Sequence, residues 1–156
     1  MIVIEMENGK EIEIELMPEA APKTCRNFEK LVKDGFYDGL ILHRVIPGFM
    51  IQGGVPLGNG MGGAVENIVG EFKANGFDNP IKHVRGVISM ARAFNPNSAS
   101  SQFFIMHADA PHLDGQYAAF GKVTSGMDAV DEIASIPTDY NDRPKMAMRM
   151  KRVYIK

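Results

Sequence analysis

A strict alternation of charged and apolar residues lies near the start of this 156-residue chain. From Glu11 to Leu16 every second residue is apolar, which is the pattern of a β-strand with one buried and one solvated face. The run from Met1 to Glu5 is a plausible partner strand, and Asn8-Gly9 lies between the two. Because Asn-Gly is a strong signal for a hairpin turn whose two central residues both have positive φ, the sequence predicts an antiparallel hairpin here.

Five further short runs are mostly apolar, and most of them are separated by Gly, Pro, Asn or Asp, as strands are. They cover residues 41–46, 50–52, 87–91, 102–106 and 118–123. Near the C-terminus, Met146, Met148 and Met150 alternate in one phase, whereas Val153 and Ile155 alternate in the opposite phase. This change of phase predicts a β-bulge in a final strand.

Two segments have helical spacing. Pro22 suits the first turn of a helix, where its missing N–H costs nothing, and apolar residues follow on one face as far as Val32. Gly35 is a C-terminal stop signal, and a second, shorter helix is indicated around residues 130–134. Many short strands with few helices predict a mainly β fold, an antiparallel barrel or sandwich rather than a parallel βαβ sheet.

Length and composition narrow the class of protein. The chain fits a single domain spanning residues 1–156, and its 45% hydrophobic and 23% charged residues exclude a disordered chain or a coiled coil. No apolar run approaches the roughly 18 residues that a membrane span needs. Cys25 is the single cysteine, so no internal disulfide forms, which suits a reducing compartment. Since the N-terminus has no basic stretch before a long apolar block, we expect no signal peptide and a cytoplasmic location.

The usual signatures of covalent, metal and nucleic-acid chemistry are weak. None of the four histidines lies at a ligand spacing, so we expect no metal site. Cys25 falls on the apolar face of the predicted helix, which favours a buried structural thiol over a nucleophile. The net charge of −2 gives no broad footprint for nucleic acid, and the basic C-terminal residues are interpreted as a solvated strand face. These residues are Lys145, Arg149, Lys151, Arg152 and Lys156.

A glycine-rich segment raises the alternative of dinucleotide binding. Gly58, Gly60 and Gly63 fit the G-x-G-x-x-G pattern, and Asp78 lies at about the expected distance beyond them. That motif needs a preceding strand, a following helix and a βαβ context. Pro56 precedes the glycines and no parallel-sheet pattern surrounds them, so this interpretation is weak.

A series of motifs in consistent order resembles the cyclophilins, a family of peptidyl-prolyl cis–trans isomerases. The motifs are HRVIPGFMIQGG at 43–54, NGMGG at 59–63, GVISMA at 86–91, PNS at 96–98, SQFFI at 101–105, LDG at 113–115 and FGKV at 120–123. They cover nearly the whole chain, and its compact form is similar to bacterial members. The resemblance implies a closed antiparallel β-barrel of about eight strands, capped by two helices, and an activity that needs no cofactor.

The reaction explains why the other signatures are missing. Resonance holds the peptide bond planar behind a barrier of about 18–20 kcal/mol, and an X–Pro bond exchanges its isomers in tens to hundreds of seconds. A catalyst makes and breaks no covalent bond and has only to favour the twisted state. In that state the nitrogen lone pair becomes a real acceptor, to which a guanidinium can donate more strongly than to the planar amide.

The resemblance also assigns roles to individual residues. It implies that Arg44 is the catalytic arginine and that His43 beside it is structural, because no proton is transferred. The residues that it implies bind substrate fall into four groups: Phe49, Met50, Phe104 and Leu113 in the proline pocket; Gln52, Ala91, Arg92 and Gln102 along the flanking backbone; Gly60 and Ala93 at the neighbouring subsite; and His112 and Tyr117 at positions where relatives vary.

Four positions depart from the pattern of many relatives, and one of them is Val55, which follows Gly54 where Asp is usual. Arg92 stands where many carry Asn, which leaves binding intact if the contact there is made by backbone. His112 replaces a Trp of some relatives, notably eukaryotic ones, and Tyr117 occupies a position often held by His. Because that Trp is a determinant of cyclosporin binding in the family, we expect cyclosporin to bind weakly.

The sequence therefore predicts an isomerase that acts on proline-containing peptides and unfolded proteins, assists folding, and is a monomer without nucleic-acid or membrane partners. A second interpretation is a binding module that recognises proline-containing partners, with isomerisation incidental. The dinucleotide binder is the third. Isomerase assays, NMR exchange spectroscopy on a bound proline peptide, and thermal shifts with NAD and NADP separate the three.

Overall fold

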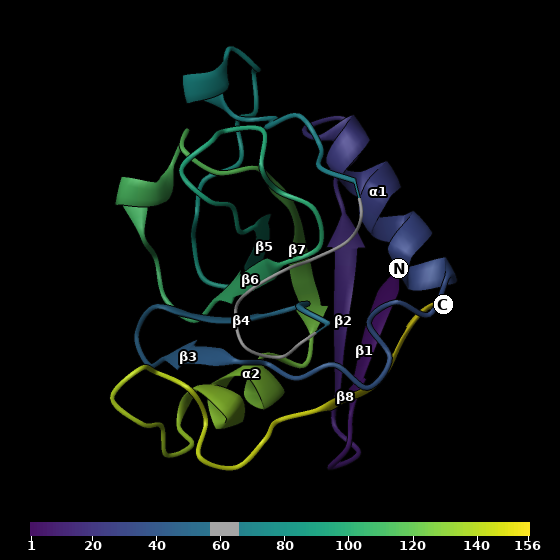
Figure 1. Cartoon of the computed structure of the whole chain (residues 1–156), viewed down its shortest axis with the longest axis vertical. Helices are drawn as coiled ribbons and strands as arrows, with labels where there is room; N and C mark the ends of the chain where they lie inside the picture. Colours follow the sequence, from purple (N-terminus) through teal and green to yellow (C-terminus); the bar gives the residue numbers. More distant parts are fainter. Residues whose placement is uncertain (57–65) are drawn as a thin grey trace.

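The computed structural model describes residues 1–56 and 66–156. Its described part contains eight strands, two α-helices and two short 3₁₀-helices (Figure 1). The strands are β1 (Ile2–Met6), β2 (Glu11–Leu16), β3 (Arg44–Ile46), β4 (Met50–Gly53), β5 (Val87–Met90), β6 (Phe103–Met106), β7 (Ala119–Ser125) and β8 (Met150–Ile155). The helices are α1 (Pro22–Lys33), η1 (Lys73–Asn75), η2 (Pro111–Leu113) and α2 (Met127–Ala134). The mainly β prediction is thus confirmed.

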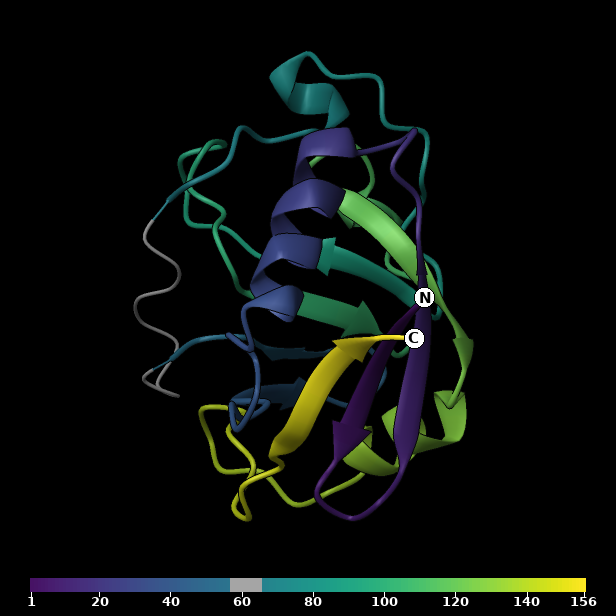
Figure 2. The ribbon, with the colours of Figure 1, turned by 90° about the vertical axis from the view of Figure 1, so that its right-hand side faces the viewer.

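All eight strands belong to one antiparallel sheet in the order β3-β4-β6-β5-β7-β2-β1-β8. The sheet curls around a core, with α1 and α2 toward opposite ends of the molecule (Figures 1 and 2). Its edge strands β3 and β8 do not pair with each other in the described part, so the sheet is a half-barrel, and the expected closed barrel is not confirmed.

The physical reason for the open edge is that the chain before β3 leaves the regular ladder. The expected strand over residues 41–46 is paired in β3 only from Arg44 onward. Ile41 instead makes an isolated bridge with Arg149, and the Leu42 N–H donates to the Met148 carbonyl at 2.9 Å. These bonds hold the two edges near each other without extending the sheet.

The predicted N-terminal hairpin is confirmed, but its predicted turn type is wrong. β1 pairs antiparallel with β2, and the Gly9 N–H donates to the Met6 carbonyl at 3.0 Å. Gly9 has φ 89°, whereas Asn8 is not among the residues with positive φ. The loop therefore holds three residues and ends on a left-handed glycine, a common hairpin form in which only that glycine needs the special conformation.

The predicted bulge in the last strand is confirmed. Glu5 of β1 is opposite Arg152 of β8, whereas the next residue, Met6, is opposite Met150. Lys151 is thus the extra residue of the bulge. The bulge lets both Met150 and Val153 face the core although they are three residues apart.

Helix α1 has the predicted limits and a cap that the local sequence does not reveal. Gly35 ends the helix with φ 71° and an N–H bond to the Val32 carbonyl. At the other end, the buried Glu71 carboxylate accepts hydrogen bonds from the backbone N–H and the hydroxyl of Thr24, both at 2.7 Å. A carboxylate at a helix N-terminus satisfies free N–H groups and complements the helix dipole.

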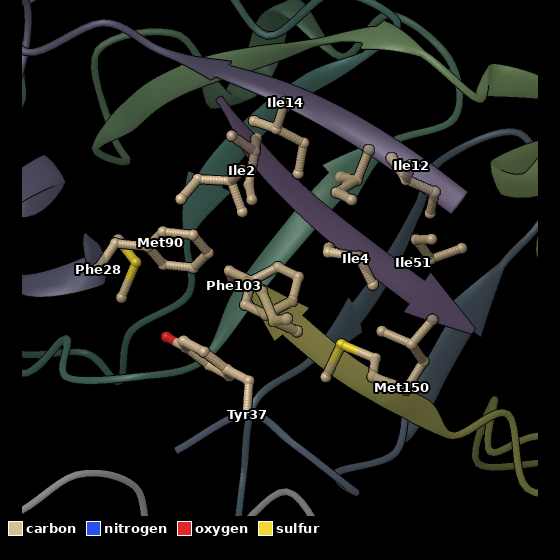
Figure 3. Close-up of a cluster of buried hydrophobic side chains, with 14 of the residues drawn as sticks. Ile2, Ile4, Ile12, Ile14, Phe28, Tyr37, Ile51, Met90, Phe103 and Met150 are labelled. Atoms are coloured by element: carbon tan, nitrogen blue, oxygen red, sulfur yellow. The ribbon is translucent and has the colours of Figure 1, made fainter. Parts of the chain in front are cut away.

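The inner core fills the concave side of the sheet. The Phe28 ring of α1 packs against Tyr37, Phe103 and Phe120 at centroid distances of 5.2, 5.7 and 5.1 Å. Figure 3 shows Phe28, Tyr37 and Phe103 close together beneath isoleucines of β1 and β2. Cys25 is buried beside them and its thiol donates to the Phe120 carbonyl, so the structural interpretation of this cysteine is confirmed. Burial raises the pKa of the Cys25 thiol to about 12.

A second apolar cluster, here called the outer cluster, lies on the opposite face of β4, β5 and β6. Alternation along β6 divides its residues between the two, because Phe103 and Ile105 face the inner core whereas Phe104 and Met106 face the outer cluster. The outer cluster consists of Met50, Val87, Phe104, Met106, Ala110, Leu113 and Ala119, with Phe49, Ala91 and Tyr117 packed at its edge. No helix in the described ranges has the length and apolar character needed to cross a membrane.

Candidate active site

The candidate site lies on the outer face of the sheet, across three neighbouring strands. Arg44 of β3 is directly opposite Gln52 of β4, and Gln52 is opposite Phe104 of β6. Directly opposed residues project to the same face of a sheet, so the pairing places the three side chains in one row. The guanidinium of Arg44 donates to Gln52 Oε1 at 3.3 Å, and Gln52 Nε2 donates to Gln102 Oε1 at 2.9 Å. The Gln52 amide thus connects Arg44 to the neighbouring strand segment.

A hollow opens beside this row, above the outer cluster. Its lining combines apolar and aromatic side chains with the polar groups of the row; these residues are Arg44, Phe49, Met50, Gln52, Ala91, Arg92, Phe104, Leu113 and Tyr117. The Phe104 and Tyr117 rings meet edge to face at 5.7 Å. His112 does not line the hollow but packs against Phe49 at 5.9 Å, so it supports one wall from outside.

The other expected site residues lie in an adjoining hollow, with one exception. Ala93 and Gln102 line it together with Ser98 and Ser100, and it shares Gln52, Ala91 and Arg92 with the first. The Ala91 N–H donates to the Gln102 carbonyl at 2.9 Å, which fixes the wall between the two hollows. Gly60, expected beside this subsite, lies outside the described residues, as do Gly58 and Gly63 of the glycine-rich motif.

The Arg92 side chain is held firmly at the rim of the hollow. Its guanidinium lies 4.8 Å from the ring centroids of both Phe72 and Tyr117, as a cation between two aromatic rings. It also donates to the Gln116 carbonyl at 2.7 Å and to the Ala93 carbonyl at 3.1 Å. The side chain therefore links the loop after β5 to the segment before β7, a role that the sequence interpretation, which considered only the backbone at this position, did not include.

His83 supports the hollow from below and was not expected in the site. Its ring stacks on Phe104 at 6.0 Å, Nε2 is 2.9 Å from the Ser89 hydroxyl, and Nδ1 is 3.2 Å from Asp114 Oδ1. This resembles a nucleophilic Ser-His-Asp set, but Ser89 is completely buried and no substrate can reach it. Burial lowers the pKa of His83, and Asp114 offsets this only in part, so the ring is neutral at pH 7.

His43, beside Arg44, has properties that favour a structural role. The residue is buried, and its Nδ1 has no hydrogen-bond partner within the described ranges. Burial, followed by the positive charges of Arg143 and Arg44, lowers the pKa of His43. A neutral, buried imidazole is a poor proton donor for a substrate.

The remaining candidate chemistries find little support in the described part of the chain. Across residues 1–56 and 66–156, no three His, Cys, Asp or Glu side chains lie together as metal ligands would. The basic C-terminal strand is paired with carboxylates, as expected of a solvated face: Arg152 with Glu5 and Lys156 with Glu13, both at 3.0 Å. All strand pairs are antiparallel, so the sheet lacks the βαβ context of a dinucleotide site.

Comparison with known proteins agrees with this architecture. A family model described as cyclophilin type peptidyl-prolyl cis-trans isomerase matches residues 1–155. The chain is 53% identical over 123 residues to peptidyl-prolyl cis-trans isomerase B of Bacillus subtilis, which covers 79% of this chain and 82% of that protein. It is 49% identical over 132 residues to the isomerase ppi1 of Schizosaccharomyces pombe, covering 84% and 83%.

A solved structure shows the same fold. The cyclophilin-type isomerase of Cryptosporidium parvum, crystallised in the presence of the dipeptide Ala-Pro, superposes with a TM-score of 0.91 at 34% identity. The match covers 99% of this chain and 98% of that one. A family model over nearly the full length, close relatives and a shared fold together show that the chain belongs to the cyclophilin-type peptidyl-prolyl cis–trans isomerases.

Proposed function

We propose that this chain accelerates rotation about X–Pro bonds by donating a hydrogen bond from Arg44 to the nitrogen of the twisted amide. The observation that carries the proposal is the position of the Arg44 guanidinium, held by Gln52 at the rim of an apolar hollow. Rotation out of the plane removes conjugation and localises the nitrogen lone pair. A fixed cation beside that nitrogen binds the twisted state better than the planar one, and this difference lowers the barrier.

The hollow supports this mechanism by fixing one side of the bond. Phe49, Met50, Phe104 and Leu113 offer an apolar surface suited to a proline ring, and the ring must stay in place while the acyl side rotates. The neighbouring strip of Gln52, Ala91 and Gln102 lines the adjoining hollow, a surface that suits the backbone of an extended peptide. The Cryptosporidium relative, crystallised in the presence of Ala-Pro, supports a proline-containing ligand.

Such a site suits flexible or unfolded segments as substrates, because an extended chain can enter a surface hollow more easily than a folded loop. We therefore propose that the protein acts on proline-containing peptides and unfolded proteins and thereby assists folding, as a cytoplasmic monomer. His112 lies behind Phe49 at the rim, and we expect weakened cyclosporin binding there.

The decisive experiment compares the wild type with Arg44→Ala in an isomerisation assay on short X–Pro peptides. We expect kcat/KM to fall on the order of a hundredfold, the typical cost of removing one transition-state donor. Stability should change little, because Arg44 is exposed and makes one long hydrogen bond to Gln52. Arg152→Ala, which removes another exposed arginine that pairs with Glu5 and does not line the hollow, is the matched control and should keep full activity. Full activity in Arg44→Ala would show the mechanism to be wrong.

Exchange NMR on a bound proline peptide separates an isomerase from a binding module. An isomerase produces cis–trans exchange peaks at enzyme concentrations far below that of the peptide. Chemical-shift changes in residues of the hollow without such exchange would instead show that the chain only binds proline-containing partners.

A further inference from the structure

His107 makes hydrogen bonds on both sides of the Gly48-Phe49 pair, in the turn between β3 and β4. This histidine directly follows β6, and its backbone N–H donates to the Phe49 carbonyl at 2.9 Å. Its side chain acts on the preceding residue, because Nδ1 accepts a hydrogen bond from the Gly48 N–H at 2.8 Å. Gly48 has φ 75°, a left-handed conformation that glycine adopts readily. One residue thus fixes the turn between β3 and β4 twice.

The other side of the imidazole is held by a charged pair. His107 Nε2 is 3.1 Å from Asp131 Oδ1 of α2, and both terminal nitrogens of Arg85 donate to the same carboxylate at 2.7 Å. Arg85 also donates to the His107 carbonyl at 2.9 Å. The hydrogen bond from Arg85 lowers the pKa of Asp131, so this carboxylate is ionised.

This arrangement selects one neutral form of the ring. An ionised carboxylate only accepts hydrogen bonds, so Nε2 must carry the hydrogen that faces Asp131. Nδ1 is then an unprotonated acceptor, as the Gly48 N–H requires. Asp131 therefore orients the His107 ring through Nε2 and leaves Nδ1 to accept from Gly48. Carboxylates orient catalytic and metal-binding histidines in the same way, through the ring nitrogen that does not contact the substrate or metal.

Phe49 depends on these bonds more than other pocket residues do. It is half-buried and lies in a turn, whereas Met50 and Phe104 are buried in paired strands. Among the described residues, its ring has one aromatic neighbour, the exposed His112, at 5.9 Å. Because the ring packs on the outer cluster but also borders the open hollow, the hydrogen bonds of its turn contribute to where it lies.

We propose that His107 is a positioning residue that, with Asp131 and Arg85, sets the place of Phe49 in the proline pocket. The proposal rests on the proposed isomerase function. His107 itself does not touch the substrate; it acts through the turn. Since Phe49 contacts the proline ring in the planar and twisted states alike, a displaced turn should weaken substrate binding more than it slows the rotation.

Two amide variants, each of which mimics one ring nitrogen of His107, test the two nitrogens separately. His107→Asn places its oxygen where Nδ1 was and can still accept from Gly48. His107→Gln places its amide where Nε2 was and can still reach Asp131, but it loses the acceptor for Gly48. We expect His107→Gln to lower kcat/KM by about tenfold, mainly through a higher KM, because small misplacements at a site are costly. We expect His107→Asn to retain most of the wild-type value.

Urea unfolding of both variants excludes a purely structural explanation. If activity follows stability in both variants, or if Asn is impaired as much as Gln, the proposal is wrong. Full activity in His107→Gln would overturn it as well.

An NMR measurement tests the inference independently of catalysis. In the wild type, a coupling through the hydrogen bond should connect the Gly48 amide ¹⁵N to His107 Nδ1, and it should vanish in His107→Gln. The affinity for an Ala-Pro peptide, measured in the same samples, should fall in that variant. If the wild type shows the coupling and binds the peptide but does not isomerise it, the proposed function fails while the positioning role stands. A wild type without the coupling refutes the positioning role alone.

Discussion

The two halves of the sheet differ in what lies on their outer face. In β1, β2 and β8 that face carries charged residues that pair across strands, such as Glu5 with Arg152 and Glu13 with Lys156. In β4, β5 and β6 the outer face is largely apolar, with Gln52 and Ser89 among the apolar residues, and every residue of these strands except Gln52 is buried. The charged outer face of the first half is solvated and needs no further cover. The second half needs a cover, and the described loops supply only part of it, so that a hollow opens beside Arg44.

This difference explains why the site lies where it does. When a ligand covers the exposed part of an apolar face, removing that surface from water lowers the free energy of the complex. The Phe104 ring is the floor of that gap, while its neighbour Phe103 points the opposite way into the closed inner core. We therefore predict that the two adjacent phenylalanines of β6 serve different purposes, Phe103 folding and Phe104 substrate binding.

The largest expected effect comes from these two phenylalanines. Phe103→Ala should lower the free energy of unfolding by about 3–5 kcal/mol, because it leaves a cavity between the rings of Phe28 and Tyr37. Phe104→Ala should cost less, since its ring already faces an opening, but it should lower kcat/KM strongly through loss of the pocket floor. Urea unfolding and the peptide assay, both carried out on each variant, measure the two effects.

Phe103→Leu provides the same comparison should the alanine variant fail to fold. A leucine fills part of the space, so this variant should be less stable than the wild type yet keep its kcat/KM under native conditions. The comparison between the two faces would be broken if Phe104→Ala destabilised the protein more than Phe103→Ala, or if it kept full activity.

Local signals in the sequence were sufficient for both α-helices and for the positions of most strands, but not for the two 3₁₀-helices. Pro22 and Gly35 mark α1 correctly, and the phase change near Met150 locates the bulge of β8, because each signal acts within a few residues. Asn8-Gly9 predicts a hairpin but not its loop length, since the dipeptide fits both a two-residue and a three-residue loop. The closure of the sheet was beyond such signals, because it depends on bonds between segments more than a hundred residues apart.

The candidate site likewise has a part that could be predicted from the sequence and a part that could not. Its composition came from the family resemblance, and alternation along β4 and β6 accounts for why those side chains share one face. The supports of the site could not be predicted, because their partners are distant in sequence. His83 and Asp114 are 31 residues apart, and Arg92 meets a carbonyl 24 residues away, at Gln116. No spacing rule connects such residues before the fold is known.

A smaller effect is expected from pH, and it should act on the site half of the sheet. Burial lowers the pKa of both His83 and His43 below the value of 6.5 that an unperturbed histidine has. Between that value and the lower folded values, the unfolded chain binds more protons than the folded one. The contribution of these two histidines to the free energy of unfolding is therefore complete above about pH 6.5, and it is lost progressively as the pH decreases below that value.

Urea unfolding at about pH 7.5 and about pH 5.5 measures this loss, and ring resonances followed by NMR assign it. The His83→Gln variant, which removes one of the two groups, should show a smaller decrease between the two pH values. If the His83 ring titrated at or above 6.5, the support of the outer cluster would not be the source of acid sensitivity.

The smallest effect is expected on the charged half of the sheet. Lys156 Nζ lies 3.0 Å from Glu13 Oε1; the Lys156 side chain is largely in water, and that of Glu13 is partly exposed. Water and salt screen such pairs, and ordering two long side chains offsets most of their attraction. Lys156→Ala and Glu13→Gln, alone and combined, should therefore leave the urea midpoint close to that of the wild type and kcat/KM unchanged. A loss comparable to that of Phe104→Ala would mean that the outer face of this half contributes to the fold or the site through more than solvation, and the contrast between the two halves would no longer explain where the site lies.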